Sequence, residues 1–301
     1  MTKQLNLGSL IEGLKNKMGY TNEKLASALG VDPRTINNYI SDKFSPTSNA
    51  DKNVFNRILG IIKANDLSLF ELFGLDGDNY LFHGSKTGIV GNISIHHNKA
   101  NNLLDFGNGF YLSESFMTAV TYVDSAPNPH IYRFKKEDIV KQNIKKFKFG
   151  TDDIGNRDWV LFIGLCRKKI ADPNDQTILN EHFDKLLKDK QLLIGKIADS
   201  FNFDVMDAFF INQYDIKQVG TALSMVNIGN QYVIKDEEIA NELKYIDDFV
   251  LEPKLKSLII TWHREHTLFL KKETQNTVKP EDAKTELKFN AIKKELINNN
   301  G

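Results

Sequence analysis

Along its first 75 residues the chain carries apolar side chains at the three- and four-residue intervals of amphipathic helices. The first such series is Leu7, Leu10, Ile11 and Leu14. Thr21 is a suitable N-cap for a second helix, which we expect to end at Gly30 because glycine tolerates the left-handed conformation found there. Asp32 and Pro33 predict the start of a third, since proline is favoured at the first helical position. Two further helices complete the predicted bundle, at 53–64 and 67–73.

A short polar loop at 74–79 separates this bundle from a central part with strand-like patterns. The apolar run at 80–85 and the alternation at 130–134 predict strands, and the run at 192–197 predicts a buried one. Three other apolar stretches favour helices, at 115–125, 159–165 and 183–187. Strands and helices are therefore expected to mix in this part of the chain.

Beyond residue 236 the pattern returns to that of helices. Ile239, Leu243 and Ile246 share one helical spacing, and a further helix is expected at 258–270. The lysine-rich stretch that follows is either a charged helix or a loose tail. We therefore predict an α+β protein in three parts, at 1–75, 79–245 and 246–301.

Composition limits the classes of protein to consider. Lysine plus arginine and aspartate plus glutamate both number 39, so the formal net charge is zero and a strongly basic nucleic-acid binder is excluded. The single cysteine, Cys166, cannot form a disulfide within one chain, which fits a reducing cytoplasm. No apolar run approaches the length of a membrane span, so we expect a soluble bacterial protein without a membrane partner. His263 and His266 have no third ligand near them in sequence, and we expect no metal site.

Two polar ring residues interrupt apolar, strand-like runs. His83 lies in Tyr80–Ser85, and Tyr111 lies in Asp105–Ser113 after a Gly-x-Gly that ends at Gly109. Glycines without a Cβ allow the backbone to pass close to a ligand. A histidine and a tyrosine that reach one cleft from neighbouring strands would hold a small planar ligand by hydrogen bonding and ring stacking.

The two runs resemble the ADP-ribosyltransferase superfamily, in its histidine–tyrosine–glutamate/glutamine branch, and within it a group of small uncharacterised bacterial domains. The likeness covers roughly residues 79–245. Five motifs of that group occur here in order: His83-Gly84-Ser85, Asp105 to Leu112, Trp159 to Ile163, Ile194 to Asp199, and Asn230 to Val233.

The resemblance implies a split β-sandwich that binds NAD, the substrate, in a cleft between two sheets. It assigns to His83 a hydrogen bond with the ribose on the adenosine side and to Tyr111 the packing against nicotinamide. The expected NAD-binding residues are His83, Gly84, Ser85, Gly109, Phe110 and Tyr111. The same residue types also have ordinary explanations, because a histidine in an apolar run is commonly a hydrogen-bonded core residue.

The third catalytic position of the family, usually glutamate, falls on Gln231 here. A glutamine cannot act as a base and carries no charge to stabilise an oxocarbenium-like centre. It can orient a ribose hydroxyl by hydrogen bonding, or it can simply be a surface residue of a strand. Carboxylates that would substitute for it are Glu114, Asp199, Glu237 and Glu238.

The segment 21–43 resembles the phage-repressor-like helix-turn-helix family, whose second helix reads base edges. The resemblance implies base contacts from Arg34, Thr35, Asn37 and Asn38, and phosphate contacts from lysines such as Lys43. A module that binds a partner protein or dimerises is the alternative.

These observations predict an NAD-dependent ADP-ribosyltransferase fused to a DNA-binding module. Such a fusion fits a bacterial toxin, a defence protein or a phage effector, and its acceptor is an unidentified protein or nucleic acid. The alternative is a DNA-binding regulator whose C-terminal domain senses NAD or ADP-ribose without transfer, because Gln231 brings no carboxylate to the site.

Overall fold

The protein is described by a computed structural model in which two compact units are distinguished. The described residues are 2–41, 48–67, 69–75, 79–95, 103–123, 125–126, 129–141, 143–150, 153–198, 202–224 and 229–300. Unit 1 comprises Met1–Gly88, Phe116–Lys136 and Tyr245–His263. Unit 2 comprises Ile89–Ser115, Glu137–Lys244 and Arg264–Gly301. The units thus group the chain differently from the three expected segments, because strands of the central part share unit 1 with the N-terminal helices.

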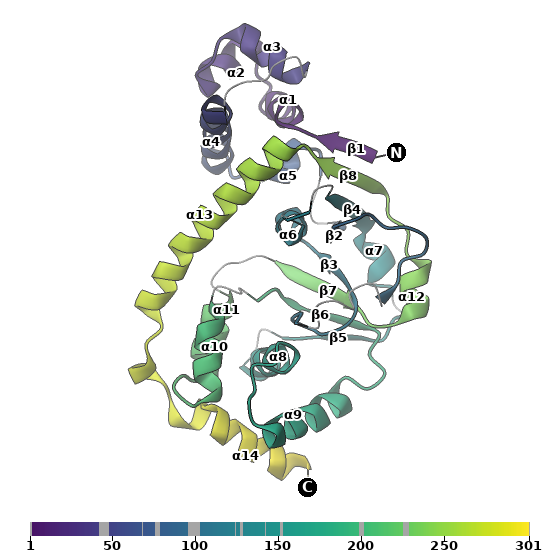
Figure 1. The fold of residues 1–301 in the computed structure, drawn as a ribbon, viewed down its shortest axis with the longest axis vertical. Helices are drawn as coiled ribbons and strands as arrows, with labels where there is room; N and C mark the ends of the chain where they lie inside the picture. The colour runs from purple at the N-terminus through teal and green to yellow at the C-terminus, as the bar shows by residue number, and fades with distance from the viewer. Residues whose placement is uncertain are drawn as a thin grey trace. The chain divides into compact units, whose positions relative to one another are not determined.

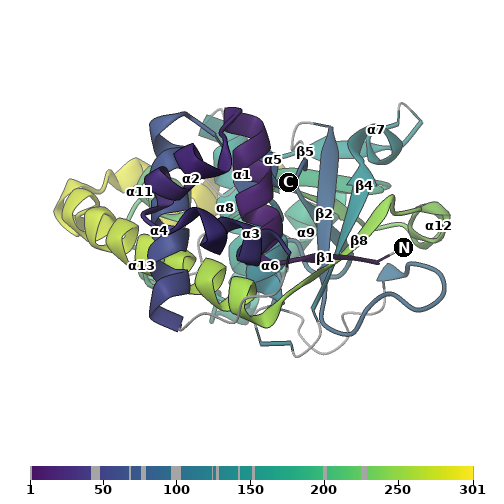
Figure 2. The same ribbon diagram turned by 90° about the horizontal axis from the view of Figure 1, so that it is seen from above.

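The N-terminal helices form as predicted (Figures 1 and 2). The Thr21 hydroxyl accepts from the Lys24 amide, and Gly30 ends the helix in the left-handed conformation at φ 65°. The Asp32 carboxylate caps the next helix by accepting from the Arg34 amide. The five helices are α1 Leu7–Met18, α2 Asn22–Leu29, α3 Pro33–Ile40, α4 Ser48–Ala64 and α5 Leu69–Leu72.

The described residues of unit 1 also include four strands, in the order β1-β8-β4-β2. Strand β1 pairs parallel with β8, and the other two pairs are antiparallel. Helix α6, Phe116–Tyr122, covers one face of this sheet, where Phe82 and Phe116 meet edge to face at 5.5 Å. The strands are β1 Thr2–Leu5, β8 Asp247–Leu251, β4 His130–Lys135 and β2 Tyr80–Ser85. Their apolar side chains and those of the helical bundle belong to one hydrophobic core.

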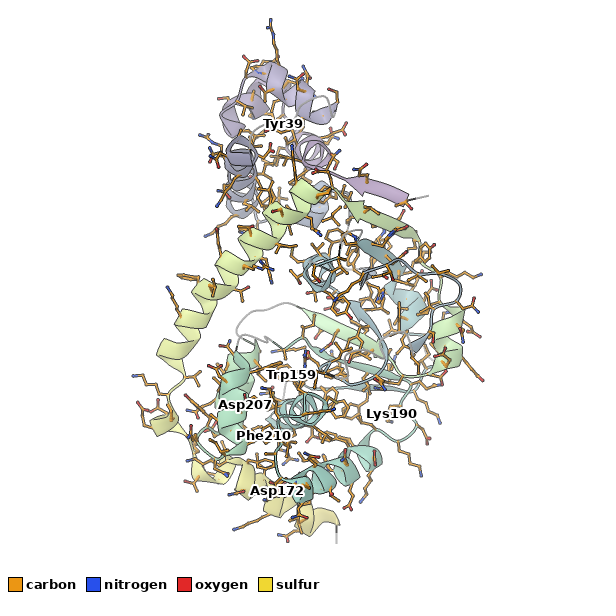
Figure 3. All side chains as sticks on the ribbon, viewed as in Figure 1. Tyr39, Trp159, Asp172, Lys190, Asp207 and Phe210 are labelled. Carbon is orange, nitrogen blue, oxygen red and sulfur yellow. The ribbon has the colours of Figure 1, made fainter. Side chains whose placement is uncertain are left out.

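Unit 2 has its own four strands, in the order β3-β7-β6-β5, and its own core around Trp159 (Figure 3). The strands are β3 Phe110–Ser113, β7 Asn230–Ile234, β6 Leu192–Lys196 and β5 Lys146–Lys148. The helices that contribute to this core are α8 Asp153–Cys166, α9 Pro173–Leu186, α10 Phe203–Phe210, α11 Ile216–Ser224 and α14 Phe289–Asn300. The strands predicted at 80–85, 130–134 and 192–197 are confirmed, as are the helices predicted at 115–125, 159–165 and 183–187.

The remaining elements include two departures from the predicted pattern. The helical spacing of Ile239, Leu243 and Ile246 is misleading. Helix α12, Glu237–Glu242, includes Ile239 but ends before Leu243, and strand β8 begins at Asp247. The Ile246 amide instead donates to the Arg133 carbonyl at the start of the β4–β8 pair.

Strand β1 was not expected either, since it is short, polar and paired with a strand near the other end of the chain. The lysine-rich end is helical: α13, Pro253–Thr277, is followed by short 3₁₀ turns at Pro280–Asp282 and Thr285–Leu287 and then by α14. Helix α14 is anchored because its Phe289, Ile292 and Leu296 are buried in the core of unit 2. The α+β class is confirmed. Over the described residues, no helix is both long enough and apolar enough to cross a membrane.

Candidate functional site

His83 shares one face of the unit 1 sheet with residues of β4. The antiparallel register puts Tyr132 opposite His83 and His130 opposite Ser85. Directly opposed residues of such a pair project to the same face, as do residues two apart in a strand. His83 and Ser85 are both half-buried. The two polar ligand candidates of β2 therefore stand beside a histidine and a tyrosine from the next strand.

Gly84 owes its identity to packing on the opposite face. Helix α6 lies so close to β2 that a Cβ at position 84 would overlap the carbonyl oxygen of Ala119. A side chain there would force α6 away from the sheet. The glycine of the His-Gly-Ser motif is thus required by the fold, and any contact it makes with a ligand uses its backbone.

Tyr111 is held by its hydroxyl group to the loop that precedes β3. The hydroxyl donates to the Gly107 carbonyl at 2.6 Å and accepts from the Phe106 amide at 3.0 Å. Burial raises the pKa of the hydroxyl, with a further rise from the charge of Asp105. Tyr111 therefore remains neutral, and its ring packs against the core of unit 2.

Gly109 and Phe110, which precede Tyr111 and were expected to bind NAD, also have packing roles. A Cβ at Gly109 would stand 2.8 Å from the Ile234 carbonyl oxygen, so only glycine lets the loop approach β7 this closely. Phe110 is buried, at 5% exposure. Both residues hold β3 against β7, and a ligand would meet their backbone.

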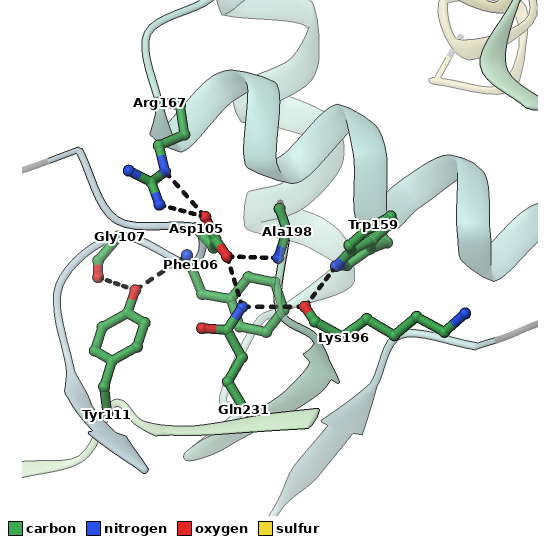
Figure 4. A network of polar contacts seen from close by, with 9 residues as sticks. All are labelled: Asp105, Phe106, Gly107, Tyr111, Trp159, Arg167, Lys196, Ala198 and Gln231. Atoms are coloured by element: carbon green, nitrogen blue, oxygen red, sulfur yellow. Dashed lines mark hydrogen bonds and ion pairs between the residues drawn. The ribbon is translucent and has the colours of Figure 1, made fainter. Parts of the chain in front are cut away.

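Gln231 is a buried residue, not a surface one, at 5% exposure. It lies opposite Ser113 on β3, so it shares a sheet face with Tyr111. Its amide nitrogen donates to the Asp105 carboxylate at 2.9 Å and to the Lys196 carbonyl at 3.1 Å (Figure 4). Both donor hydrogens of the amide are therefore used within the protein.

Asp105 is the centre of this network, and its importance was missed in the sequence. Its carboxylate is 3% exposed and accepts from Arg167 at 2.9 and 2.6 Å, from the Ala198 amide at 3.1 Å and from Gln231. The Trp159 indole donates to the same Lys196 carbonyl at 3.0 Å (Figure 4).

The network joins four of the five motifs. Asp105 opens the second, Trp159 opens the third, the Lys196 carbonyl and the Ala198 amide belong to the fourth, and Gln231 belongs to the fifth. These segments, far apart in sequence, meet because each supplies one partner to a buried carboxylate or carbonyl. Burial of polar groups is tolerated when every partner is present.

The carboxylates proposed as substitutes for the third catalytic residue have different surroundings. Glu114 accepts from the Tyr232 hydroxyl at 2.7 Å and from the Asn230 side-chain amide at 2.9 Å. Glu237 accepts from the Ile95 amide at 3.0 Å. Glu238 lines a cavity of about 450 Å³ beside α12. Asp199 lies outside the described residues.

Cys166 is not a nucleophile in this environment. Burial raises the pKa of its thiol to about 12. A thiol attacks as the thiolate, which is scarce at neutral pH when the pKa is this high. Cys166 instead packs against the core of unit 2 as a small apolar residue.

The central segment of the chain matches a known family model. Residues 80–245 match a family model described as a protein of unknown function, DUF3990. The chain belongs to this family. The DUF3990 segment contains all five motifs and begins and ends close to the region in which they were found. No curated protein and no solved structure matches the chain.

A second family model, described as helix-turn-helix, matches residues 11–49, which precede the DUF3990 segment. The second helix of the motif is α3. Arg34 and Asn37 are exposed on it, and Thr35 and Asn38 are half-buried. Lys43 lies outside the described residues. The exposed polar face of α3 has the residue types that read base edges.

Helix α3 is anchored from its buried side. Tyr39, which Figure 3 labels, donates its hydroxyl hydrogen to the Asp51 carboxylate on α4 at an oxygen–oxygen distance of 2.9 Å. Asp51 is 4% exposed, and Lys254, at the start of α13, lies 3.9 Å from its second oxygen. Burial raises the pKa of Asp51. The orientation of α3 is thus fixed by a buried hydrogen bond as well as by apolar packing.

Proposed function

We propose that the protein is an NAD-dependent ADP-ribosyltransferase that binds DNA through its helix-turn-helix module. The observation that carries this proposal is the position of the two ring residues, His83 on β2 and Tyr111 on β3, in one family segment. Both residues are half-buried. NAD is the substrate. The acceptor is a protein or a nucleic acid, and the enzyme acts on it as a toxin, a defence protein or a phage effector.

The resemblance and the observed contacts together suggest a role for each residue. His83 hydrogen-bonds a ribose, and Ser85 contacts the nicotinamide side. Tyr111 contributes its ring, because its hydroxyl is already bonded to Phe106 and Gly107 and the raised pKa keeps it neutral. The ring stacks on nicotinamide.

Cleavage breaks the bond between the nicotinamide nitrogen and C1′ of ribose and creates an oxocarbenium-like centre. Gln231 contributes through its carbonyl oxygen alone, since its amide hydrogens bond Asp105 and Lys196. That oxygen can accept from a ribose hydroxyl and orient the sugar. It cannot remove a proton from the acceptor.

Replacing His83 by alanine is expected to weaken NAD binding roughly tenfold or more, because a buried polar group of the ligand loses its partner. Isothermal titration with NAD measures the change. The matched control is His182→Ala, which removes a half-buried histidine of α9 in unit 2 and should leave the affinity unchanged. Wild-type protein that does not bind NAD at millimolar concentration would contradict the proposal.

The second candidate function is a regulator that senses NAD or ADP-ribose without reaction. It is favoured by the neutral Gln231, whose amide is committed to Asp105. Incubation of the protein with labelled NAD and cell lysate separates the two functions. Label on protein or nucleic acid, with free nicotinamide, supports the transferase, whereas tight binding without nicotinamide release supports the sensor.

For the DNA-binding module, Arg34→Ala is expected to lower the affinity for a cognate site by roughly 1–3 kcal/mol, or about 5- to 150-fold, if the guanidinium reads a base. A gel-shift or anisotropy titration against selected DNA measures it at fixed salt. Lys185→Ala, on α9, is the control that also removes one positive charge. Equal affinities of the two variants would contradict a base-reading role for α3.

A further inference from the structure

We propose that His130, held by Asp248, is the general base that deprotonates the acceptor in the transfer reaction. The proposal rests on the proposed function and supplies the proton acceptor that Gln231 cannot provide. His130 lies on β4, directly opposite Ser85 on β2 and on the same sheet face as His83. It was seen in the sequence only as one position of an alternating strand.

The imidazole of His130 is paired with a carboxylate. His130 Nδ1 lies 2.8 Å from Asp248 Oδ1 on the neighbouring strand β8. The other oxygen of Asp248 accepts from the Thr2 hydroxyl of β1, also at 2.8 Å. The carboxylate is thus held from both sides and is 13% exposed. In this geometry it accepts the Nδ1 hydrogen, which leaves the lone pair on Nε2.

The His130 ring is held by a neighbouring ring and keeps its Nε2 edge partly exposed. His130 stacks on Tyr132 with a ring-centre distance of 5.9 Å and an interplanar angle of 10°. Tyr132 is in turn packed at 4.7 Å against Tyr245. Within the described part of the chain, no hydrogen bond occupies Nε2, and the side chain of His130 is 25% exposed.

Gly88, in the turn that follows β2, adopts φ +83°, a conformation that favours glycine, and a Cβ there would be in ordinary contact with Nε2, at 3.7 Å. This turn therefore passes beside the Nε2 edge of the ring, next to the strand that carries His83 and Ser85.

The proton and electron movements balance without a further reactant. The acceptor oxygen or nitrogen forms a bond to C1′ of the nicotinamide ribose and gives its proton to His130 Nε2. The bond from C1′ to nicotinamide breaks, and its electron pair neutralises the pyridinium nitrogen. Asp248 stabilises the imidazolium, which then returns its proton to solvent. Asp248 acts through His130 and is a positioning residue.

The test is single-turnover transfer from labelled NAD by the full-length protein. His130→Gln is expected to lower the transfer rate by on the order of 10²–10⁴-fold, with little change in the affinity for NAD. Asp248→Asn should lower it too, since the amide would donate to Nδ1 and move the ring hydrogen to Nε2. The control is His182→Gln, which changes another histidine that lies near an aspartate, with Nε2 3.5 Å from Asp158.

The pH profile separates a base from a merely structural residue. The titratable groups described on this face are His83, Tyr132, Asp248 and, beside Tyr132, Tyr245. If His130 is the base, the transfer rate of the wild type falls at acidic pH. His130→Gln should then lack this acidic limb of the pH–rate profile. His130→Ala should regain transfer when imidazole is added to the solution.

Three results would overturn the proposal. A His130→Gln variant that folds and keeps both the wild-type rate and the wild-type pH profile contradicts the base directly. An unfolded His130→Gln moves the decision to Asp248→Asn and to imidazole rescue of His130→Ala, and absence of an effect in both contradicts it as well. Wild-type protein that neither binds NAD nor releases nicotinamide removes the proposed function, and this inference with it.

Discussion

Asp105→Ala is expected to destabilise unit 2 by roughly 3–5 kcal/mol, because it breaks a buried ion pair and leaves its partners without an acceptor. The carboxylate is 3% exposed and receives four donors, two of them from Arg167. Alanine leaves the Gln231 amide and the Ala198 amide facing apolar surroundings. Arg167 is partly relieved by water, since its side chain is 24% exposed.

Urea unfolding followed by circular dichroism measures this change in the free energy of unfolding. The matched control is Asp207→Ala, whose carboxylate is 53% exposed and pairs with Lys169 at 2.8 Å. An exposed ion pair contributes little. Asp105→Asn keeps one accepting oxygen and should fall between the two. If Asp105→Ala and Asp207→Ala unfold at the same urea concentration, the network is not what holds the four motifs together.

Gln231→Glu is expected to destabilise the protein strongly at pH 8, by roughly 3–5 kcal/mol, because it puts an unpaired charge in a buried site. An oxygen would replace the amide nitrogen that now lies 2.9 Å from the Asp105 carboxylate and 3.1 Å from the Lys196 carbonyl. Two carboxylates this close cannot both be ionised without a large cost. The folded state would therefore favour the protonated glutamate.

The sign of the pH dependence follows from this preference. A glutamate whose pKa in the folded state is raised above its unfolded value costs stability once the pH exceeds the unfolded value, about 4.3. The deficit of Gln231→Glu relative to wild type should thus be largest at pH 8 and shrink as the pH falls toward 5. Thermal unfolding at several pH values measures it.

Two controls identify the cause. Gln231→Leu removes the donor without adding charge, so its deficit should be smaller and independent of pH. Gln191→Glu changes a similar pair, in which the amide donates to Asp236 at 2.9 Å, at a half-buried site where water screens the charge. A Gln231→Glu protein as stable as wild type at pH 8 would mean that Asp105 and Gln231 do not meet in solution.

The helical bundle could be predicted because its determinants are local. Thr21, Gly30 and Asp32 each cap a helix within three residues of their own position. Strands β1 and β8 could not, because what stabilises them is their pairing with each other from opposite ends of the sequence. The apolar spacing that ends at Ile246 suggests that a helix continues there. The chain forms β8 instead, because the backbone of β8 hydrogen-bonds to β1 and β4.

Candidate site residues could be named from the sequence, but their contacts could not. Gln231 was identified, and on chemical grounds a glutamate there is expected to assist the reaction. The contact of Gln231 with Asp105 could not be read from the sequence, and it adds an expected loss of stability for that glutamate. His130 could not be singled out, because its partner Asp248 lies just past the residues that were predicted to continue a helix. Aspartates that pair with distant residues leave no periodic signal along the chain.

Because unit 1 has a single hydrophobic core, the helix-turn-helix cannot be removed without disturbing the sheet of that unit. Deleting the first 75 residues would remove β1 from the edge of the sheet and uncover the apolar side chains that the bundle buries against it. The remaining strand β8 would present an unpaired edge, which favours aggregation. Replacement of the helix-turn-helix by another domain during evolution is therefore constrained, because a new N-terminal domain must also complete the sheet that carries His83.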